Sequence, residues 1–406
     1  MRRRAQAMAL LILAAAVPLG EGLALVALAL LAGLTASRWR ALRPVRLAQT
    51  PLPAVGLGLG VWAGAGALAL ASGSQGWLRP AELGRWVPLL LLPLLPMAAT
   101  GLSRCSLRRA AGAFVGASLL MAILGLAQVA FNLQLQELWG RGDLANVSQS
   151  MMPHDGSRSV AGGLFRHRLK LAHLLVLAAL GLQARQLWLL LPRRQRVAEL
   201  LALAVIWAAL AATYARGALF SLVLVGLMQT FGAAAAAGAG RRRAARALVL
   251  AVPLGLALLA QPSVRARLVS SGSAEARAVR GLVWSRAVAL AVDHPLGLGL
   301  GNYPQAVGAY YDAVEPSFDV RTYPHSLYMA ALVETGPVGL LGFVAAWMAL
   351  ALAWARRPGA VAATGLGGVV MLGCLGLTHD VLYHVPVALG FMGLLGWALA
   401  WEVADA

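Results

Sequence analysis

Apolar runs separated by short connectors account for most of this 406-residue chain and restrict what it can fold into. A helix needs about 20 predominantly apolar residues to cross the hydrocarbon core of a bilayer, where its backbone bonds must be made internally. Twelve apolar windows occur, at 7–19, 22–36, 53–71, 86–102, 110–132, 169–191, 198–213, 216–231, 246–262, 326–354, 360–377 and 384–401. The first two are short enough to form one broken hairpin around Glu21. The pattern predicts an all-α polytopic membrane protein with about 12 transmembrane helices.

The composition supports this fold class and bears on partners. Sixty percent of the residues are apolar and 12% are charged, against about 25% charged in an ordinary soluble domain. A formal net charge of +19 would suggest a nucleic-acid partner in a soluble protein. Here the arginines gather between the apolar windows, as membrane topology requires. We therefore expect membrane lipids as partners, and no nucleic acid.

The arginine distribution also predicts sidedness. Alternate connectors are rich in arginine and contain almost no acids, which is typical of cytoplasmic loops, and they place both termini in the cytoplasm. These are 2–4, 38–46, 104–109, 193–196, 241–246 and 356–357. The opposite connectors are 72–85, 133–168, 213–217, 263–325 and 378–384, and they hold most of the acids together with further arginines. Orientation does not require these external cations, so they are candidates for binding an anion.

One external connector, 263–325, is far longer than the others and divides the chain. The predicted organisation is an N-terminal transmembrane bundle (1–262) of about nine spans, this external loop with short helices, and C-terminal transmembrane helices (326–406) with about three spans. The loop is expected to form part of the active site. No internal repeat of the kind that marks secondary transporters is found.

Arg216 is the first candidate. Tyr214-Ala-Arg216-Gly217 separates two apolar windows with almost no loop, so the chain must turn at the external interface with Arg216 on the turn. One interpretation is an interfacial arginine that snorkels to water. The other is a guanidinium held at membrane depth, where a lower dielectric strengthens its bidentate contact with a phosphate.

The second candidate segment is 280–303. It predicts a short external helix that ends at His294-Pro295, followed by glycines at 297, 299 and 301. This glycine series neither follows a strand nor opens a helix, which excludes a dinucleotide site. Arg280 and Arg286 lie six residues apart and thus on different faces of the helix, so at most one would face a given ligand.

The third candidate is His325, which precedes the apolar window 326–354. A lone histidine there is commonly a cap or an interfacial residue, but imidazole also suits a general base for a sugar hydroxyl. Glu334 would be costly facing lipid. Gly336-Pro337 predicts a break, so residues 325–335 would form an external or half-buried helix leading into the span.

Further polar residues occur on the external side. His379, Asp380 and His384 lack the spacing of a zinc site. They fit a polar interface or, with Asp319 or Asp293, a divalent metal. The segment 162–173 opens another span with Arg166, His167, Arg168, Lys170 and His173. It is either an aqueous rim or, because the positive-inside rule makes such a rim unusual, a site for a lipid phosphate.

With these residues in view, the chain resembles the O-antigen ligase family of the O-antigen ligase/polymerase superfamily. The resemblance is dense over about residues 210–345 and only topological elsewhere. The Arg216-Gly217 step opens a span, Arg280 and Trp284 precede the His-Pro-glycine stretch 294–303, and His325-Ser-Leu-Tyr328 leads to Glu334-Thr-Gly336-Pro-Val-Gly339. Ser326 departs from the asparagine usual after the histidine, which puts an amide contact there in doubt.

The resemblance implies a GT-C-like glycosyltransferase. It would move O-antigen from undecaprenyl diphosphate to the lipid A–core oligosaccharide, at the periplasmic face of the bacterial inner membrane, in lipopolysaccharide biosynthesis. By matching positions, Arg216 and Arg280 would bind the diphosphate, and His325 would act on the acceptor hydroxyl or complete the anion site. Further substrate contacts are expected from Arg166, Arg168, Lys170, Arg265, Arg286, Arg321 and Tyr328. No metal, nucleotide or other cofactor is expected.

Other activities remain open on the sequence. An O-antigen polymerase or a protein O-oligosaccharyltransferase of the same superfamily would use the same donor and a different acceptor. A transporter or flippase of lipid-linked glycans would instead require charged or helix-breaking residues at mid-membrane in matching halves. The unexplained cations gather on one face, which favours chemistry at the membrane surface.

Overall fold

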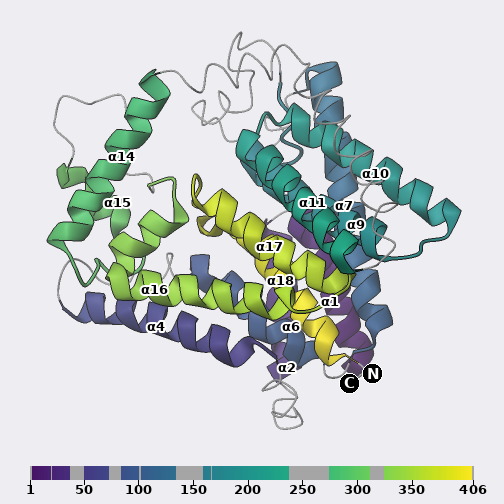
Figure 1. Ribbon diagram of the computed structural model, residues 1–406, viewed down its shortest axis with the longest axis horizontal. Coiled ribbons are helices and arrows are strands. Elements are labelled where there is room, and N and C mark those ends of the chain that lie inside the picture. Colours follow the sequence, from purple (N-terminus) through teal and green to yellow (C-terminus); the bar gives the residue numbers. More distant parts are fainter. Residues whose placement is uncertain are drawn as a thin grey trace.

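The computed structural model of the protein describes residues 2–19, 21–36, 50–72, 84–99, 102–133, 159–165, 167–236, 274–310 and 324–404. The regular elements in these ranges are helices (Figure 1). In the first half of the chain they are α1 (Arg2–Leu19), α2 (Glu21–Ala36), α4 (Leu52–Ala71), η2 (Gly84–Leu90), α6 (Leu91–Ala99), α7 (Arg104–Phe131) and α9 (Arg168–Trp188). In the second half they are α10 (Arg193–Ala212), α11 (Arg216–Ala236), α14 (Ala274–Asp293), α15 (Tyr303–Ala306), η5 (Val307–Tyr310), α16 (Leu327–Ala355), α17 (Ala360–Gly376), η6 (Val381–Tyr383) and α18 (Val385–Val403).

The predicted all-α polytopic membrane fold is confirmed. Within the described ranges, α4, α7, α9, α10, α11, α16 and α18 are long and apolar enough to cross a membrane, and α1, α2, α6 and α17 are shorter apolar helices. Each predicted apolar window therefore coincides with a helix, except the window 246–262, which lies outside the described residues. The total of twelve spans stays a prediction, because four of these helices fall short of full spanning length.

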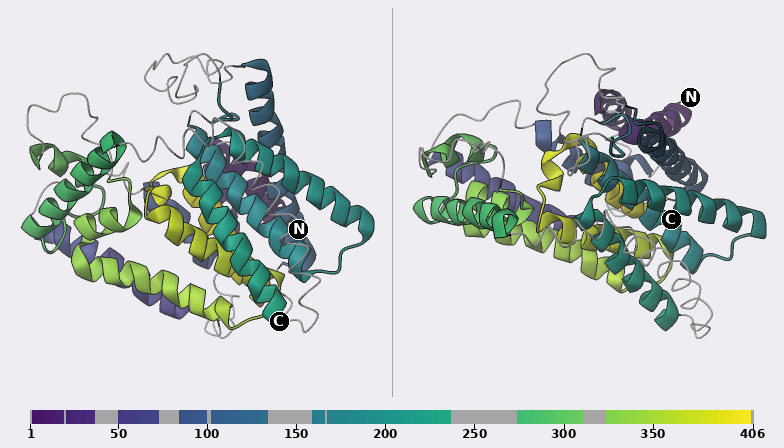
Figure 2. Two further views of the ribbon diagram at one scale, coloured as in Figure 1. Left: turned by 45° about the horizontal axis from the view of Figure 1, so that its top comes forward. Right: turned by 90° about the horizontal axis from the view of Figure 1, so that it is seen from above.

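Helix α9 lies in the middle of the bundle. Ten consecutive residues, Leu171–Leu180, are buried. A helix that is buried on every side must be surrounded by other helices. Helices α7, α10, α11, α17 and α18 contact it, and the views in Figures 1 and 2 show it enclosed among them.

Helices α4 and α16 lie side by side at one edge of the molecule (Figures 1 and 2). They approach each other closely at Gly58 and Gly342. A Cβ atom on either glycine would lie 2.7 Å from the carbonyl oxygen of the other. Lipid offers no hydrophobic driving force between helices, so such small residues stabilise the contact by allowing close van der Waals packing of the backbones.

Helix α16 is broken at Gly336, as the Gly336-Pro337 pair predicted. Gly336 has φ 65° and ψ −178°, which interrupts the helical bonding pattern. The carbonyl oxygens of Val333 and Glu334 instead accept hydrogen bonds from the backbone N–H groups of Leu298 and Gly299, at 3.0 and 2.8 Å. The glycine-rich loop after α14 thus satisfies backbone groups that the break exposes at membrane depth.

This docking explains the glycines of the loop and gives a first prediction. Gly297 has φ 90°, and a Cβ atom there would lie 2.6 Å from the carbonyl oxygen of Glu334. We expect Gly297→Ala to destabilise the protein, because a positive φ alone costs roughly 1–3 kcal/mol and the clash adds to it. The measurement is the temperature at which half of the purified protein stays monodisperse in detergent. Gly308→Ala is the control, since its Cβ would meet nothing within 4 Å, and an equal loss there would contradict the prediction.

Candidate functional site

Several helix ends meet at one end of the bundle, around the connector between α17 and α18 (residues 377–384). Ser326, just before α16, donates through Oγ to the carbonyl oxygen of Gly376 at 3.3 Å. At Gly217 in α11, a Cβ atom would lie 3.7 Å from Nε2 of His379. The ring of His167, before α9, stacks on that of His384 with centroids 6.4 Å apart. The starts of α9, α11 and α16 therefore all lie next to the end of α17 or the connector that follows it.

Arg216 is the first residue of α11, and a tight turn holds it there. Tyr214 adopts φ 55°. The hydroxyl of Thr213 donates to the carbonyl oxygen of Leu210 at 2.6 Å and accepts from the N–H of Ala215 at 3.2 Å. The predicted turn between two spans is thus present, with Arg216 half-buried. Its backbone position is fixed before any ligand binds.

Arg168, the first residue of α9, lies beside Arg216. The two guanidiniums are close enough for their positive charges to interact. Both residues stand at helix N-termini, where the backbone dipole is also positive. Nη1 of Arg168 is buried and has no hydrogen-bond partner among the described residues. Two half-buried guanidiniums in this arrangement suit a diphosphate, whose oxygens would bridge them and relieve their repulsion.

Four histidines lie close to one another at these helix starts: His167, His173, His379 and His384. The rings of His173 and His379 meet edge to face, with centroids 5.6 Å apart. His173 is only 1% exposed, and neither of its ring nitrogens has a hydrogen-bond partner in the part of the chain that the structure describes. From the sequence, His167 and His173 belonged to a possible site for a lipid phosphate, and His379 and His384 to a polar interface or metal site, but the four were not expected to lie together. The available signal was the polar run 378–384 between two apolar windows.

The electrostatics of the cluster follow from burial and from its excess of basic groups. Burial lowers the pKa of His167 to about 4, and positive charge from His384, Arg168, Lys170 and His379 contributes. His167 is therefore neutral near pH 7. Its Nδ1 accepts from the N–H of Leu169 at 3.2 Å and so caps α9. A basic cluster in which a histidine stays neutral favours an incoming anion.

His325 lies at the start of α16, near the same connector. It is exposed and has φ 50°, a conformation that non-glycine residues adopt at a cost of order 1–3 kcal/mol and that clusters at functional sites. Ser326 caps α16, because its Oγ accepts from the N–H of Met329 at 3.4 Å. The serine at this position is therefore a helix cap that also joins α16 to α17.

Helix α14 also contacts the segment that leads into α16. The indole Nε1 of Trp284 donates to the carbonyl oxygen of Pro324 at 3.0 Å, directly before His325. Residue 280 lies one helical turn before Trp284, on the same face, whereas Arg286 lies on another face. The side chain of Arg280 is outside the described part of the structure, so its contact with substrate stays a prediction.

The remaining predicted residues fall into three groups. Arg166, Arg265 and Arg321 lie outside the described residues. Lys170 is half-buried and close enough to His167 to affect it electrostatically. The hydroxyl of Tyr328 donates to the carbonyl oxygen of Gly373 at 3.3 Å, which holds α16 against α17. A substrate contact by Tyr328 or Lys170 stays a prediction.

Glu334 is completely buried, and its carboxylate is directed at protein rather than lipid. Its Oε2 accepts from the hydroxyl of Tyr383 at 2.7 Å. This bond joins the broken helix α16 to the α17–α18 connector. It therefore fixes the position of the start of α16, which carries His325, relative to the four histidines. The acid that would be costly in lipid therefore helps to assemble the site.

Metal ligation was one alternative for the external acids and histidines. Among the described residues, no group of three or more His, Cys, Asp or Glu side chains is placed to hold a metal ion. Asp319 lies outside these residues, and Asp293 accepts a hydrogen bond from the hydroxyl of Tyr310 at 2.6 Å. Catalysis without a metal or other cofactor stays a prediction.

Comparison with known proteins gives the family. No curated protein matches the chain. Residues 201–344 match the family model described as O-Antigen ligase. This segment contains Arg216, residue 280, the glycine loop and His325 with the broken helix. The family comprises glycosyltransferase-like membrane enzymes that act on lipid-linked glycans. The match covers residues 201–344 of the 406-residue chain and supports membership of the O-antigen ligase superfamily.

Proposed function

We propose that the protein is an O-antigen ligase. It transfers O-antigen from undecaprenyl diphosphate to the lipid A–core oligosaccharide at the periplasmic face of the bacterial inner membrane, and both its termini are cytoplasmic. The observation that carries the proposal is the pair of half-buried arginines, Arg168 and Arg216, within a basic cluster at the same end of the bundle as His325.

The reaction follows from this arrangement. The diphosphate gains negative charge as its bond to the anomeric carbon breaks, so guanidiniums that are already in place stabilise the transition state more than the bound donor. His325 takes the proton from the acceptor hydroxyl while the hydroxyl oxygen bonds to that carbon. The electron pair of the broken bond leaves with undecaprenyl diphosphate. One displacement inverts the anomeric configuration, and a product linkage that retained it would contradict this mechanism.

The low pKa of His167 predicts that donor binding takes up a proton. In the protein without donor, burial and the neighbouring basic groups His384, Arg168, Lys170 and His379 lower the pKa of His167 to about 4. A bound diphosphate reverses the local potential and raises that pKa. At pH values between the pKa of His167 without donor and its pKa with donor bound, the affinity for a short polyprenyl diphosphate should rise as pH falls. The rise is at most about tenfold per pH unit when one proton is taken up.

Calorimetric titration at pH 7.5 and pH 5.5 tests this coupling. His167→Asn keeps a side-chain acceptor that can cap α9 and removes the titrating imidazole. We expect the variant to bind with a weaker dependence on pH than the parent. A parent affinity that falls between pH 7.5 and pH 5.5, or that is equal at pH 7.5, pH 5.5 and a further measurement at pH 4.5, would contradict the predicted proton uptake.

The identity of the glycan acceptor distinguishes the activities found in this superfamily. The test uses purified protein in lipid vesicles, a lipid-linked O-antigen donor, EDTA, and one acceptor at a time. A ligase gives glycan bonded to the lipid A–core acceptor, at a rate that EDTA does not change. Elongation of a second lipid-linked glycan would identify a polymerase, and glycosylated protein would identify an oligosaccharyltransferase. Movement of the donor between leaflets with no new glycosidic bond would identify a transporter.

A further inference from the structure

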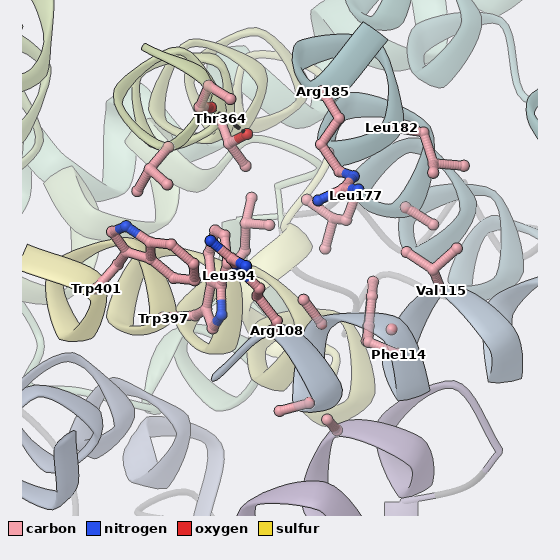
Figure 3. A pocket seen from close by; sticks show the side chains of 18 of the residues that line it. Arg108, Phe114, Val115, Leu177, Leu182, Arg185, Thr364, Leu394, Trp397 and Trp401 are labelled. Atoms are coloured by element: carbon pink, nitrogen blue, oxygen red, sulfur yellow. Dashed lines mark hydrogen bonds between the residues drawn. The ribbon is translucent and has the colours of Figure 1, made fainter. Parts of the chain in front are cut away.

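A cavity lies at the other end of the helices that carry the candidate site. Its volume is about 1140 Å³, and α1, α7, α9, α17 and α18 contribute to its walls (Figure 3). Arg185 lines it near the end of α9, whose start carries Arg168. Trp401 lines it near the end of α18, which begins next to His384. A spanning helix separates its two ends by the thickness of the bilayer, so this cavity and the candidate site belong to different leaflets.

The cavity has an apolar wall and a basic rim. Leu177, Leu182, Phe114 and Leu394 form part of the wall, while Arg108 and Arg185 extend into the cavity from α7 and α9 (Figure 3). The lining includes four arginines, at 104, 108, 185 and 357, and two glutamates, at 199 and 402. The described residues of the lining therefore carry a net charge of +2.

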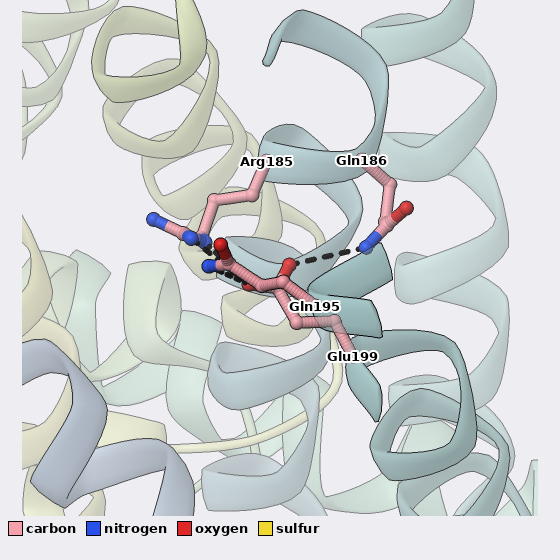
Figure 4. A network of polar contacts seen from close by, with 4 residues as sticks. All are labelled: Arg185, Gln186, Gln195 and Glu199. Atoms are coloured by element: carbon pink, nitrogen blue, oxygen red, sulfur yellow. Dashed lines mark hydrogen bonds and ion pairs between the residues drawn. The ribbon is translucent and has the colours of Figure 1, made fainter. Parts of the chain in front are cut away.

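Both glutamates are paired with arginine. Glu199 accepts from Arg185 at 2.9 Å and also from Gln186 and Gln195 (Figure 4). Glu402 forms an ion pair with Arg357 and accepts from Nε1 of Trp354. These pairs neutralise the acids of the rim. The other two arginines of the described lining are Arg104 and Arg108.

Arg104 and Arg108 are held near the mouth by tryptophan. Their guanidinium carbons lie 5.8 and 5.5 Å from the ring centroid of Trp401. Trp397 donates through Nε1 to the carbonyl oxygen of Leu107 at 3.0 Å, which fixes α18 against α7. Tryptophan and arginine together are typical of the level of lipid head groups, where an indole is half in water and a guanidinium meets phosphate.

We propose that this cavity binds a phospholipid with an anionic head group, taken from the leaflet opposite the candidate site. The phosphate contacts Arg104 and Arg108, and the acyl chains extend along the wall formed by Leu177, Leu182 and Leu394. The apolar wall favours a lipid over a soluble anion. The net charge of +2 favours an anionic lipid over a zwitterionic one, because basic pockets between transmembrane helices bind anionic head groups. The proposal does not depend on which glycan acceptor the enzyme uses.

Native mass spectrometry of the whole protein tests the proposal, with added phosphatidylglycerol or phosphatidylcholine. We expect retained phosphatidylglycerol adducts on the parent, and about fivefold weaker binding for each of Arg104→Gln and Arg108→Gln. Arg109→Gln is the matched control, because it removes the same charge from an exposed neighbour on α7 that does not line the cavity.

Three results would overturn the proposal. Equal retention of phosphatidylglycerol and phosphatidylcholine would show that charge does not select the occupant. Competition by millimolar inorganic phosphate alone would identify a site for a soluble anion. A loss of binding in Arg109→Gln as large as in Arg108→Gln would show a general surface-charge effect. Thermal stability of each variant without added lipid separates loss of the site from loss of the fold.

Discussion

Arg216→Ala is expected to lower kcat for glycan transfer by about 10²–10³, the usual effect of removing one group that stabilises developing charge. Arg216 begins α11 in a half-buried position next to Arg168, and its turn is fixed by the bonds of Thr213. Arg216→Lys should restore only part of the rate. An ammonium keeps the charge, but it cannot make two parallel bonds to the diphosphate.

The measurement is the initial rate of transfer in vesicles at saturating donor. Arg194→Ala is the control, since Arg194 is an exposed arginine at the start of α10, at the other end of that helix from Arg216. Comparable rates in Arg216→Ala and Arg194→Ala would remove Arg216 from the mechanism. Full activity of Arg216→Lys would mean that charge alone matters and that bidentate contact does not.

The parts of this site that the sequence predicted are those set by local chemistry. An arginine between two apolar runs required the turn at 213–217, and Gly336-Pro337 required a break in α16. Both are present. Their partners, however, come from distant segments. The carbonyl oxygens that the break exposes are satisfied by Leu298 and Gly299, a contact that no local pattern contains.

The sequence analysis did not predict that the four histidines lie together, for the same reason. His167 and His384 belong to helices far apart in the chain, and only the packing of α18 and α17 against α9 brings them together. Conversely, helical periodicity alone predicts that residues 280 and 286 lie on different faces of a helix. The hydrogen bond from Trp284 to Pro324 shows which of these faces contacts the segment that leads to His325.

Ser326 shows how a departure from a family pattern is resolved by its neighbours. The usual asparagine after the histidine would offer an amide. Here the hydroxyl of Ser326 caps α16 and binds the carbonyl oxygen of Gly376. Serine and asparagine are comparable helix caps, so either residue fixes the backbone that carries His325.

His325→Ala is expected to lower kcat by about 10²–10⁴, the range for losing a general base. His325 is exposed at the start of α16, where a sugar hydroxyl from solvent can reach it. His325→Gln distinguishes two roles, because an amide can donate to a phosphate but cannot take a proton. If His325 is the base, the glutamine variant is as slow as the alanine variant and binds the donor normally. If His325 only completes the anion site, glutamine restores much of the rate.

Ser326→Ala is the matched structural control for this experiment. It removes a cap worth about 1 kcal/mol and the bond to Gly376, while the imidazole of His325 remains. We expect a modest loss of rate that follows the loss of thermal stability. A Ser326→Ala enzyme as slow as His325→Ala would mean that the position of the first turn of α16, rather than proton transfer by His325, limits catalysis. The general-base role would then have to be assigned to another group at this end of the bundle, and the half-buried His379 and His384 would be the next residues to test.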